Sequence, residues 1–432
     1  MPWSLMAFLR QSFGGIVGKK SARDAATLGA RLIVARGMSV VTLIVAAWLV
    51  DIQAFAEFGV YQTLATLAGI AVFLRYDAAI VAARDASEAR IAFQICLLVG
   101  TALWLVFTLA SLSSGALGWM RGELAVLLPL SILARGGLRL TFARATGTGD
   151  FKGVGRGILI QSMIQPVALL ALVLSQVEDV LCFAIADVAG HGGGVAYLMW
   201  RQRHHLRELI QGWSRAALMA AAGRWKSLPL YNLPASFFSL AFIMSPLLVT
   251  PMGAGAVFAG HAALAYRIFD VPTQILAAAS TPIFLNLRPS IQRRTPIFGR
   301  LMMIGFILIL GAAYAGMAEL LLLVGPFLEG TAFAGLAEVV PVIAAFHLFV
   351  ALAAPLIDSC ALYPQQRRLV LIQGLALVGG ALAAVLAVTT SAQTALAALA
   401  ILAGLRMLAI GELLRTLTGI SHRRFVPVRP RA

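Results

Sequence analysis

Residues 123–144 read ELAVLLPLSILARGGLRLTFAR, an apolar run that carries Arg135 and Arg139 in its second half and ends at Arg144. A membrane-spanning helix needs about 20 mostly apolar residues, which this run provides. An arginine at the centre of such a helix costs roughly 2.5–3.5 kcal/mol on insertion scales, and that cost is tolerated when the side chain faces water or a partner. Arg135 and Arg139 are four residues apart and therefore share one helix face. The run predicts a spanning helix that lines a polar cavity inside a bilayer.

Similar apolar runs recur along the whole chain. Of its 432 residues, 60% are hydrophobic and 12% are charged, whereas average proteins carry about 25% charged residues. The chain is therefore expected to be an all-α polytopic membrane protein. We place twelve transmembrane helices at residues 27–49, 58–82, 91–112, 123–144, 154–175, 180–200, 228–251, 257–285, 297–324, 339–362, 369–389 and 393–417.

The basic residues are distributed unevenly about the predicted membrane. With the N-terminus inside, 26 of the 34 lysines and arginines lie in cytoplasmic segments, and one, Arg121, lies in an outer loop. This distribution follows the positive-inside rule and places both termini in the cytoplasm. It explains the net charge of +16 without nucleic acid as a partner, and the expected partners of the basic loops are anionic membrane lipids.

The longest loop divides the chain into two halves of six spans. Within it, Leu206, Leu209, Ile210 and Trp213 recur at helical spacing opposite arginines, which predicts a basic amphipathic helix on the inner surface; a plain linker is the alternative. Both halves start on the same side, so a parallel pseudo-two-fold is expected to relate them, with the substrate path between them. The predicted parts are a cytoplasmic N-terminal segment (1–26), an N-lobe (27–200), the linker helix (201–227), a C-lobe (228–417) and a basic cytoplasmic tail (418–432).

Prolines are concentrated in the seventh span, at Pro229, Pro234 and Pro246. Each proline removes a backbone hydrogen bond and permits a kink. The span is therefore expected to be a bent gate helix. The alternative is that the prolines are merely tolerated, as is common in membrane helices.

The candidate substrate-binding residues are arginines inside the predicted spans. Arginine stays charged and donates two parallel hydrogen bonds to a phosphate or carboxylate, so a lumen lined with arginine indicates an anionic substrate. Arg135 and Arg139 form the strongest candidate pair, because no carboxylate lies within a helical turn of either and only an anion or an acid from another helix can relieve their repulsion. Arg31 is set apart, because it lies near the inner face and can reach the headgroups. The predicted substrate-binding set is Arg36, Arg75, Arg135, Arg139, Arg267 and Arg406.

Four aspartates inside the spans are candidates for charge pairing or for binding a coupling ion: Asp77, Asp187, Asp270 and Asp358. Asp270 lies three residues after Arg267, which is ion-pair spacing on a helix. An internal salt bridge and a ligand contact are both consistent with that spacing. The sequence leaves open which acid neutralises an arginine and which binds a cation.

Catalytic and metal-binding motifs are missing from the sequence. The three cysteines have no metal-site or disulfide spacing, and no GxSxG, HExxH or P-loop pattern occurs. The chain is therefore expected not to be an enzyme, and to need neither a metal nor a cofactor.

The second span carries a recognisable signature. Residues 58–61 (FGVY) and 74–81 (LRYDAAIV), followed by 84–89 (RDASEA), resemble the span-2 signature of bacterial polysaccharide-biosynthesis flippases, FGxYxx…xxRYExAI, with Asp77 in place of glutamate. These flippases belong to the multidrug/oligosaccharidyl-lipid/polysaccharide exporter (MOP) superfamily. Residues 258–267 (FAGHAALAYR) and 365–367 (QQR) are similar to its span 8 and to a short loop, whereas the family's SPEDFG turn is replaced by residues 53–59 (QAFAEFG).

The resemblance implies two six-helix lobes and a function as a flippase. The protein would move an undecaprenyl-diphosphate-linked oligosaccharide, the repeat unit of an O-antigen or exopolysaccharide, across the bacterial inner membrane by alternating access. The diphosphate would meet the cavity arginines. A polysaccharide polymerase and the export machinery would be its partners.

Two other classes of protein are alternatives to a flippase. A cation-coupled multidrug exporter of the same superfamily would prefer acidic cavity residues. A membrane-embedded polysaccharide polymerase or acyltransferase would carry a large periplasmic loop or a catalytic His/Asp set inside the membrane. Here the outer loops are short, and His347 alone is placed for such a role.

Overall fold

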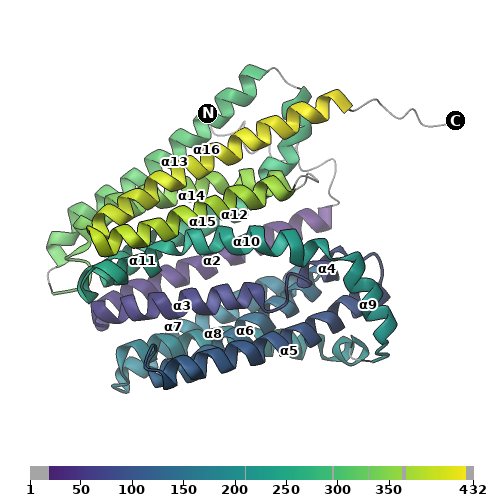
Figure 1. Ribbon diagram of the computed structural model, residues 1–432, viewed down its shortest axis with the longest axis horizontal. Helices are drawn as coiled ribbons and strands as arrows, with labels where there is room; N and C mark the ends of the chain where they lie inside the picture. Colours follow the sequence, from purple (N-terminus) through teal and green to yellow (C-terminus); the bar gives the residue numbers. More distant parts are fainter. Residues whose placement is uncertain (1–18, 210, 294–295, 329, 362–365, 425–432) are drawn as a thin grey trace. The chain divides into compact units, whose positions relative to one another are not determined.

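The chain is built of helices along its length (Figure 1). The computed structural model describes residues 19–209, 211–293, 296–328, 330–361 and 366–424, and for Arg36 and Asp358 it describes the backbone only. In this part of the chain, eight helices are long and apolar enough to cross a membrane, or nine when one bent pair is counted as a span. The predicted all-α polytopic membrane class is confirmed.

Each of the twelve predicted spans coincides with a helix or with consecutive pieces of one. Helices satisfy their own backbone polar groups, which lipid cannot do. The helices are α2 (Lys19–Leu49), α3 (Ile52–Ala71), α4 (Asp77–Ala82), α5 (Ala86–Ala116), α6 (Gly122–Gly147), α7 (Phe151–Leu174), α8 (Asp179–Leu209), α9 (Arg215–Arg224), α10 (Leu233–Ile243), α11 (Ser245–Gly253), α12 (Ala256–Arg293), α13 (Pro296–Val324), α14 (Val340–Ala361), α15 (Gln366–Thr389) and α16 (Ala392–Arg424).

The second predicted span is interrupted between α3 and α4. Leu74 and Arg75 adopt left-handed backbone angles, with φ of 47° and 67°, a conformation that costs about 1–3 kcal/mol for a residue with a side chain. Long-range packing holds this strain, because the ring of Phe73 occupies the space beside Gly100, where a Cβ atom would lie 2.5 Å from Phe73 Cε1. The span expected over 58–82 is therefore interrupted at residues 72–76.

The seventh span is bent, as its prolines predict. A short π-helical turn (Leu228–Asn232) leads into α10, and α11 follows at an angle of 45°. Pro229, Pro234 and Pro246 each occupy one of the first two positions of one of these pieces. A proline is tolerated there because the first amides of a helix have no partner within the helix.

The predicted linker helix is divided in two. Helix α8 continues as far as Leu209, and α9 begins at Arg215 after Gly212, which has a φ of 66°. The side chain of Ser214 accepts a hydrogen bond from the Ala217 amide and caps α9. On α5, the buried Gln94 donates to the carbonyls of Leu209 and Gln211, which attaches the end of α8 to that helix.

The helices form two compact units. Unit 1 comprises residues 1–42, 72–176 and 185–225, and unit 2 comprises residues 43–71, 177–184 and 226–432. Unit 2 thus contains α3 and the first residues of α8 together with the second half of the sequence. The lobe boundaries at 27–200 and 228–417 remain a prediction.

Close contact between α3 and α12 in unit 2 depends on glycine. A Cβ atom added at Gly260 would lie 2.1 Å from the carbonyl oxygen of Ile52. The clash would be with a backbone atom, which cannot move away by changing rotamer as the end of a side chain can. Gly260 therefore lets α12 approach the start of α3.

Gly260→Ala is expected to lower the free energy of unfolding by about 1–3 kcal/mol, the usual cost of overpacking. Gly316→Ala on α13 is the control, because a Cβ atom there meets nothing within 4 Å. The measurement is chemical unfolding of the purified protein in detergent. Equal midpoints for the two variants would contradict the close contact.

Candidate functional site

Three helices of unit 1 bring buried charges together. Helix α6 carries Arg135 and Arg139, α8 carries Asp187, and α4 carries Asp77. The two arginines share a face of α6, as their spacing predicts. Each meets an aspartate from another helix, which was the alternative to an anion that the sequence left open.

Arg135 belongs to a hydrogen-bonded cluster around Asp187. Its Nη2 atom donates to Asp187 Oδ1 at 2.6 Å, and the Ser131 hydroxyl donates to Asp187 Oδ2 at 2.7 Å. His191 Nδ1 lies 3.4 Å from Asp187 Oδ1, and His191 Nε2 lies 3.1 Å from Gln161 Nε2. The Asp187 side chain is 1% exposed, so its charge depends on these partners.

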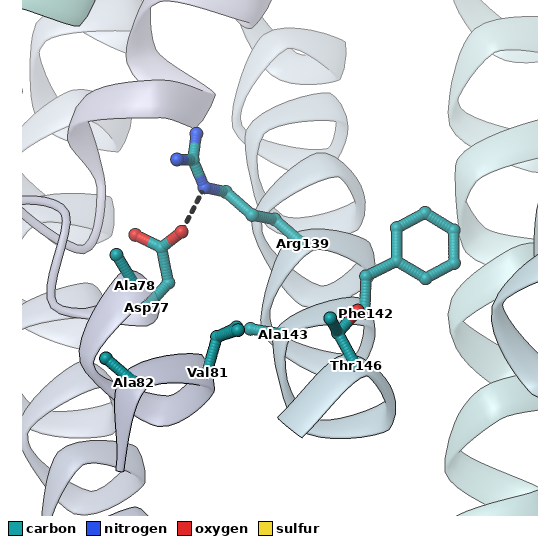
Figure 2. A pocket seen from close by; sticks show the side chains of 8 residues that line it. All are labelled: Asp77, Ala78, Val81, Ala82, Arg139, Phe142, Ala143 and Thr146. Atoms are coloured by element: carbon teal, nitrogen blue, oxygen red, sulfur yellow. Dashed lines mark hydrogen bonds and ion pairs between the residues drawn. The ribbon is translucent and has the colours of Figure 1, made fainter. Parts of the chain in front are cut away.

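Arg139 and Asp77 line a pocket of about 550 Å³. Arg139 Nε donates to Asp77 Oδ2 at 2.7 Å. Figure 2 shows the guanidinium reaching from α6 to the carboxylate on α4, with Phe142 and Thr146 following on α6. Asp77 Oδ1 is buried and has no hydrogen-bond partner among the described residues. This oxygen can therefore accept a proton or bind a cation.

Arg75 adds a third positive charge to this group. It lies in the break between α3 and α4, and its charge interacts with those of Arg139 and Asp77. The three arginines of this group in unit 1, Arg75, Arg135 and Arg139, face the two aspartates Asp77 and Asp187.

Arg267 of unit 2 lies among aromatic rings. Its guanidinium is 4.3 Å from the ring centroid of Phe58 and 5.6 Å from that of Phe183, distances at which cations and rings attract each other. Its Nη2 atom donates to Gln62 Oε1 at 2.7 Å. Asp270, the partner suggested by spacing, accepts a hydrogen bond from Gln274.

Arg406 is buried in unit 2 among neutral groups. It is 3% exposed and lies on α16. Its Nε atom donates to Gln373 Oε1 at 2.7 Å and its Nη2 atom to Ser239 Oγ at 2.6 Å. These partners come from α15 and α10.

Three further residues singled out from the sequence are Arg31, Arg36 and Asp358. The side chains of Arg36 and Asp358 lie outside the described residues. Arg31 donates to the carbonyl oxygen of Lys152 at 3.0 Å, in the segment predicted to face the cytoplasm. Substrate binding by the arginines, and ion binding by the aspartates, remain predictions.

Sequence reasoning did not find several of these partners. Ser131 was visible one turn before Arg135, where a hydroxyl can reach the guanidinium. Gln62 and Phe183 gave no such signal, because they are far from Arg267 in sequence.

A second polar pocket, of about 430 Å³, lies in unit 1 on the predicted cytoplasmic side and is lined by Arg144, Thr148, Asp150, Arg201 and Gln202. Arg201 donates to both oxygens of Asp150, at 2.6 and 2.9 Å. These bonds hold the pKa of the Asp150 carboxyl below its usual range. Among the residues that the structure describes, no group of three or more His, Cys, Asp or Glu side chains could hold a metal ion.

The fold is similar to solved transporters. No protein-family model and no curated protein sequence matches the chain. An inward-facing multidrug resistance MATE family transporter of the MOP superfamily matches with a TM-score of 0.64 and 14% identity, over 97% of this chain and 100% of that chain. An outward-facing structure with the same description matches with a TM-score of 0.61 and 14% identity, over 94% and 97%.

A third solved structure is a MOP superfamily transporter from Pyrococcus furiosus, described as having a binding pocket of reversed polarity that suggests a different function. It matches with a TM-score of 0.57 and 12% identity, over 93% of this chain and 97% of that chain. Identities this low are evidence of a shared fold only. The chain is a multi-pass membrane protein with the fold of MOP superfamily transporters.

Proposed function

We propose that this protein is a transporter that exports an organic molecule by alternating access. The observation that carries the proposal is the fold match, which extends over 97% of this chain and 100% of an inward-facing transporter. The same fold is also solved facing outward. A protein built to switch between these two states can move a bound molecule across a membrane without opening a continuous pore.

The substrate proposed for this transporter carries a negative charge. In unit 1, the guanidinium of Arg139 lines a pocket of about 550 Å³ and donates its Nε atom to Asp77. A guanidinium that lines a pocket can donate parallel hydrogen bonds to a phosphate or a carboxylate, so it attracts an anionic group of the substrate. The reversed pocket polarity described for the Pyrococcus furiosus protein supports the idea that this fold accommodates pockets of different charge.

Two kinds of substrate fit within this proposal. Drug-like molecules have the better support, because the solved structures with high similarity are described as multidrug resistance transporters. A polyprenyl-diphosphate-linked saccharide is the second candidate, favoured by the flippase-like residues from Phe58 to Val81. Cytoplasmic termini and contact with anionic lipids follow from the distribution of basic residues and belong to both versions. The bacterial inner membrane and cooperation with a polysaccharide polymerase belong to the second version.

Asp77 is the residue proposed to couple export to an ion gradient. Its Oδ1 atom is buried without a hydrogen-bond partner among the described residues, at the edge of the Arg139 pocket. A proton or cation bound there would compete with Arg139 for the carboxylate. A carboxylate that binds a cation is what the alternative of a cation-coupled exporter requires.

The test is transport by the purified protein in liposomes. Three fluorescent probes are compared: an anionic drug-like dye, a cationic dye of similar size and a prenyl-diphosphate saccharide. Movement of the anionic dye is expected to exceed that of the cationic dye. Movement of the saccharide in addition would support the flippase version.

The matched control is Arg415→Gln, which removes an arginine whose side chain is 79% exposed and paired with Glu412. It is expected to transport like the unmodified protein. Transport of the cationic dye alone would refute the proposed substrate charge, and transport of none of the probes would refute the export function for these substrate classes.

A further inference from the structure

Arg406 differs from the arginines of unit 1 in the chemistry of its partners. Arg135 and Arg139 each contact an aspartate. Arg406 instead donates to an amide oxygen and to a hydroxyl, and its guanidinium lies 5.2 Å from the ring centroid of Phe242. In the described parts of the chain, no carboxylate forms an ion pair with it.

The surroundings of Arg406 exclude water. Arg406 is 3% exposed, and both Gln373 and Phe242 are 0% exposed. A charge removed from water is strongly disfavoured unless an opposite charge accompanies it. Amide and hydroxyl dipoles and an aromatic face offset part of this cost. The site is short of one negative charge.

Gln373 supplies a second observation. Its Oε1 atom must face Arg406, because the guanidinium has only donors and needs an acceptor. Its Nε2 atom is therefore fixed as a donor, and it is buried with no hydrogen-bond partner among the described residues. Buried donors are nearly always paired. The missing partner of Gln373 is an acceptor, and the missing partner of Arg406 is a negative charge.

We propose that Arg406 and Gln373 form a binding site for a small monovalent anion such as chloride. The ion supplies both the acceptor and the charge, and the Ser239 hydroxyl beside Arg406 offers a further donor. The site is built from α10, α15 and α16 within unit 2. It does not depend on the proposed export function, so either proposal can fail without the other.

Asp358 is the acid that a competing explanation would use. Helices α14 and α16 run in register, since Cβ atoms at Gly404 and Gly411 would lie 3.4 Å from Phe349 Cε2 and 3.9 Å from Leu356 Cδ1. Cys360 Sγ on α14 lies 3.9 Å from the carbonyl oxygen of Ile410, so position 358 lies near the level of Ile410, about one turn beyond Arg406. The partners of Arg406 in the described part of the chain are neutral, and the experiment tests Asp358 directly.

The test is thermal unfolding of the full-length purified protein in detergent, in sodium chloride and in sodium gluconate at equal ionic strength. Chloride is expected to raise the unfolding temperature in a saturable way. A concentration of about one hundred times the Kd lowers the unfolding equilibrium constant about a hundredfold. Arg406→Gln is expected to abolish this chloride response.

Gln373→Glu makes the test independent of whether Arg406→Gln folds. The new carboxylate supplies the missing charge from within the protein, so the variant is expected to unfold at a higher temperature in gluconate and to ignore chloride. Gln161→Glu is the matched control, because Gln161 contacts His191 in unit 1 and lies outside the site. This control is expected to keep the chloride response.

Three results would overturn the proposal. The first is identical unfolding of the unmodified protein in the two salts. The second is a chloride response that persists in both Arg406→Gln and Gln373→Glu. The third is a response that appears only in Asp358→Asn, which would identify Asp358 as the counter-charge of Arg406.

Discussion

Asp187→Asn is expected to lower the free energy of unfolding by about 3–5 kcal/mol, the usual cost of removing one member of a buried ion pair. The substitution leaves the Arg135 guanidinium, whose side chain is 14% exposed, without its carboxylate. The bond from Ser131 is weakened as well, because it loses a charged acceptor. Chemical unfolding in detergent measures the loss.

The double variant Arg135→Met/Asp187→Leu separates the charge from the packing. It removes both charges and replaces them with apolar side chains of comparable size, so most of the lost stability is expected to return. If the double variant is as unstable as Asp187→Asn, the hydrogen bonds of Ser131 and His191 carry the stability in place of the charge balance.

Arg139→Gln is expected to reduce export of the anionic dye at least tenfold, which corresponds to about 1.4 kcal/mol of lost binding. The substitution removes the positive charge of Arg139 from the pocket and leaves the negative charge of Asp77. Asp77→Asn changes the charge in the other direction, so it is expected to tighten binding of the same dye. Dye uptake into liposomes and dye binding to the purified protein measure the two effects.

The prediction depends on opposite changes in dye affinity, a decrease for Arg139→Gln and an increase for Asp77→Asn. Simple damage to the fold would weaken binding in both variants. Equal losses in the two would show that the ion pair serves the structure of unit 1 and does not select the charge of the substrate. Arg415→Gln again serves as the control for a change of net charge at an exposed position.

Hydropathy was sufficient to predict the class of fold. Apolar runs such as 123–144 have no other stable arrangement in lipid, and every predicted span coincides with a helix or with consecutive helical pieces. The bend of the seventh span was also visible, because proline acts on the backbone of its own helix.

The break at Leu74 and Arg75 was not predictable from local sequence. Residues 72–76 contain neither glycine nor proline, and the left-handed angles are held by the packing of Phe73 beside Gly100. The partners of the arginines were hidden for a related reason. Asp187 lies 52 residues after Arg135, and whether the two meet depends on the rotation of α6 and α8 about their own axes.

The two aspartates that neutralise α6 lie on opposite sides of it in sequence. Asp77 lies 62 residues before Arg139, and Asp187 lies 52 residues after Arg135. A ribosome therefore makes the partner of Arg139 before α6 emerges, but makes the partner of Arg135 only after α7 and the beginning of α8. During synthesis Arg135 is therefore in place before Asp187 exists. The buried ion pair of Arg135 is thus completed by a helix that is made later, whereas the partner of Arg139 is made before it.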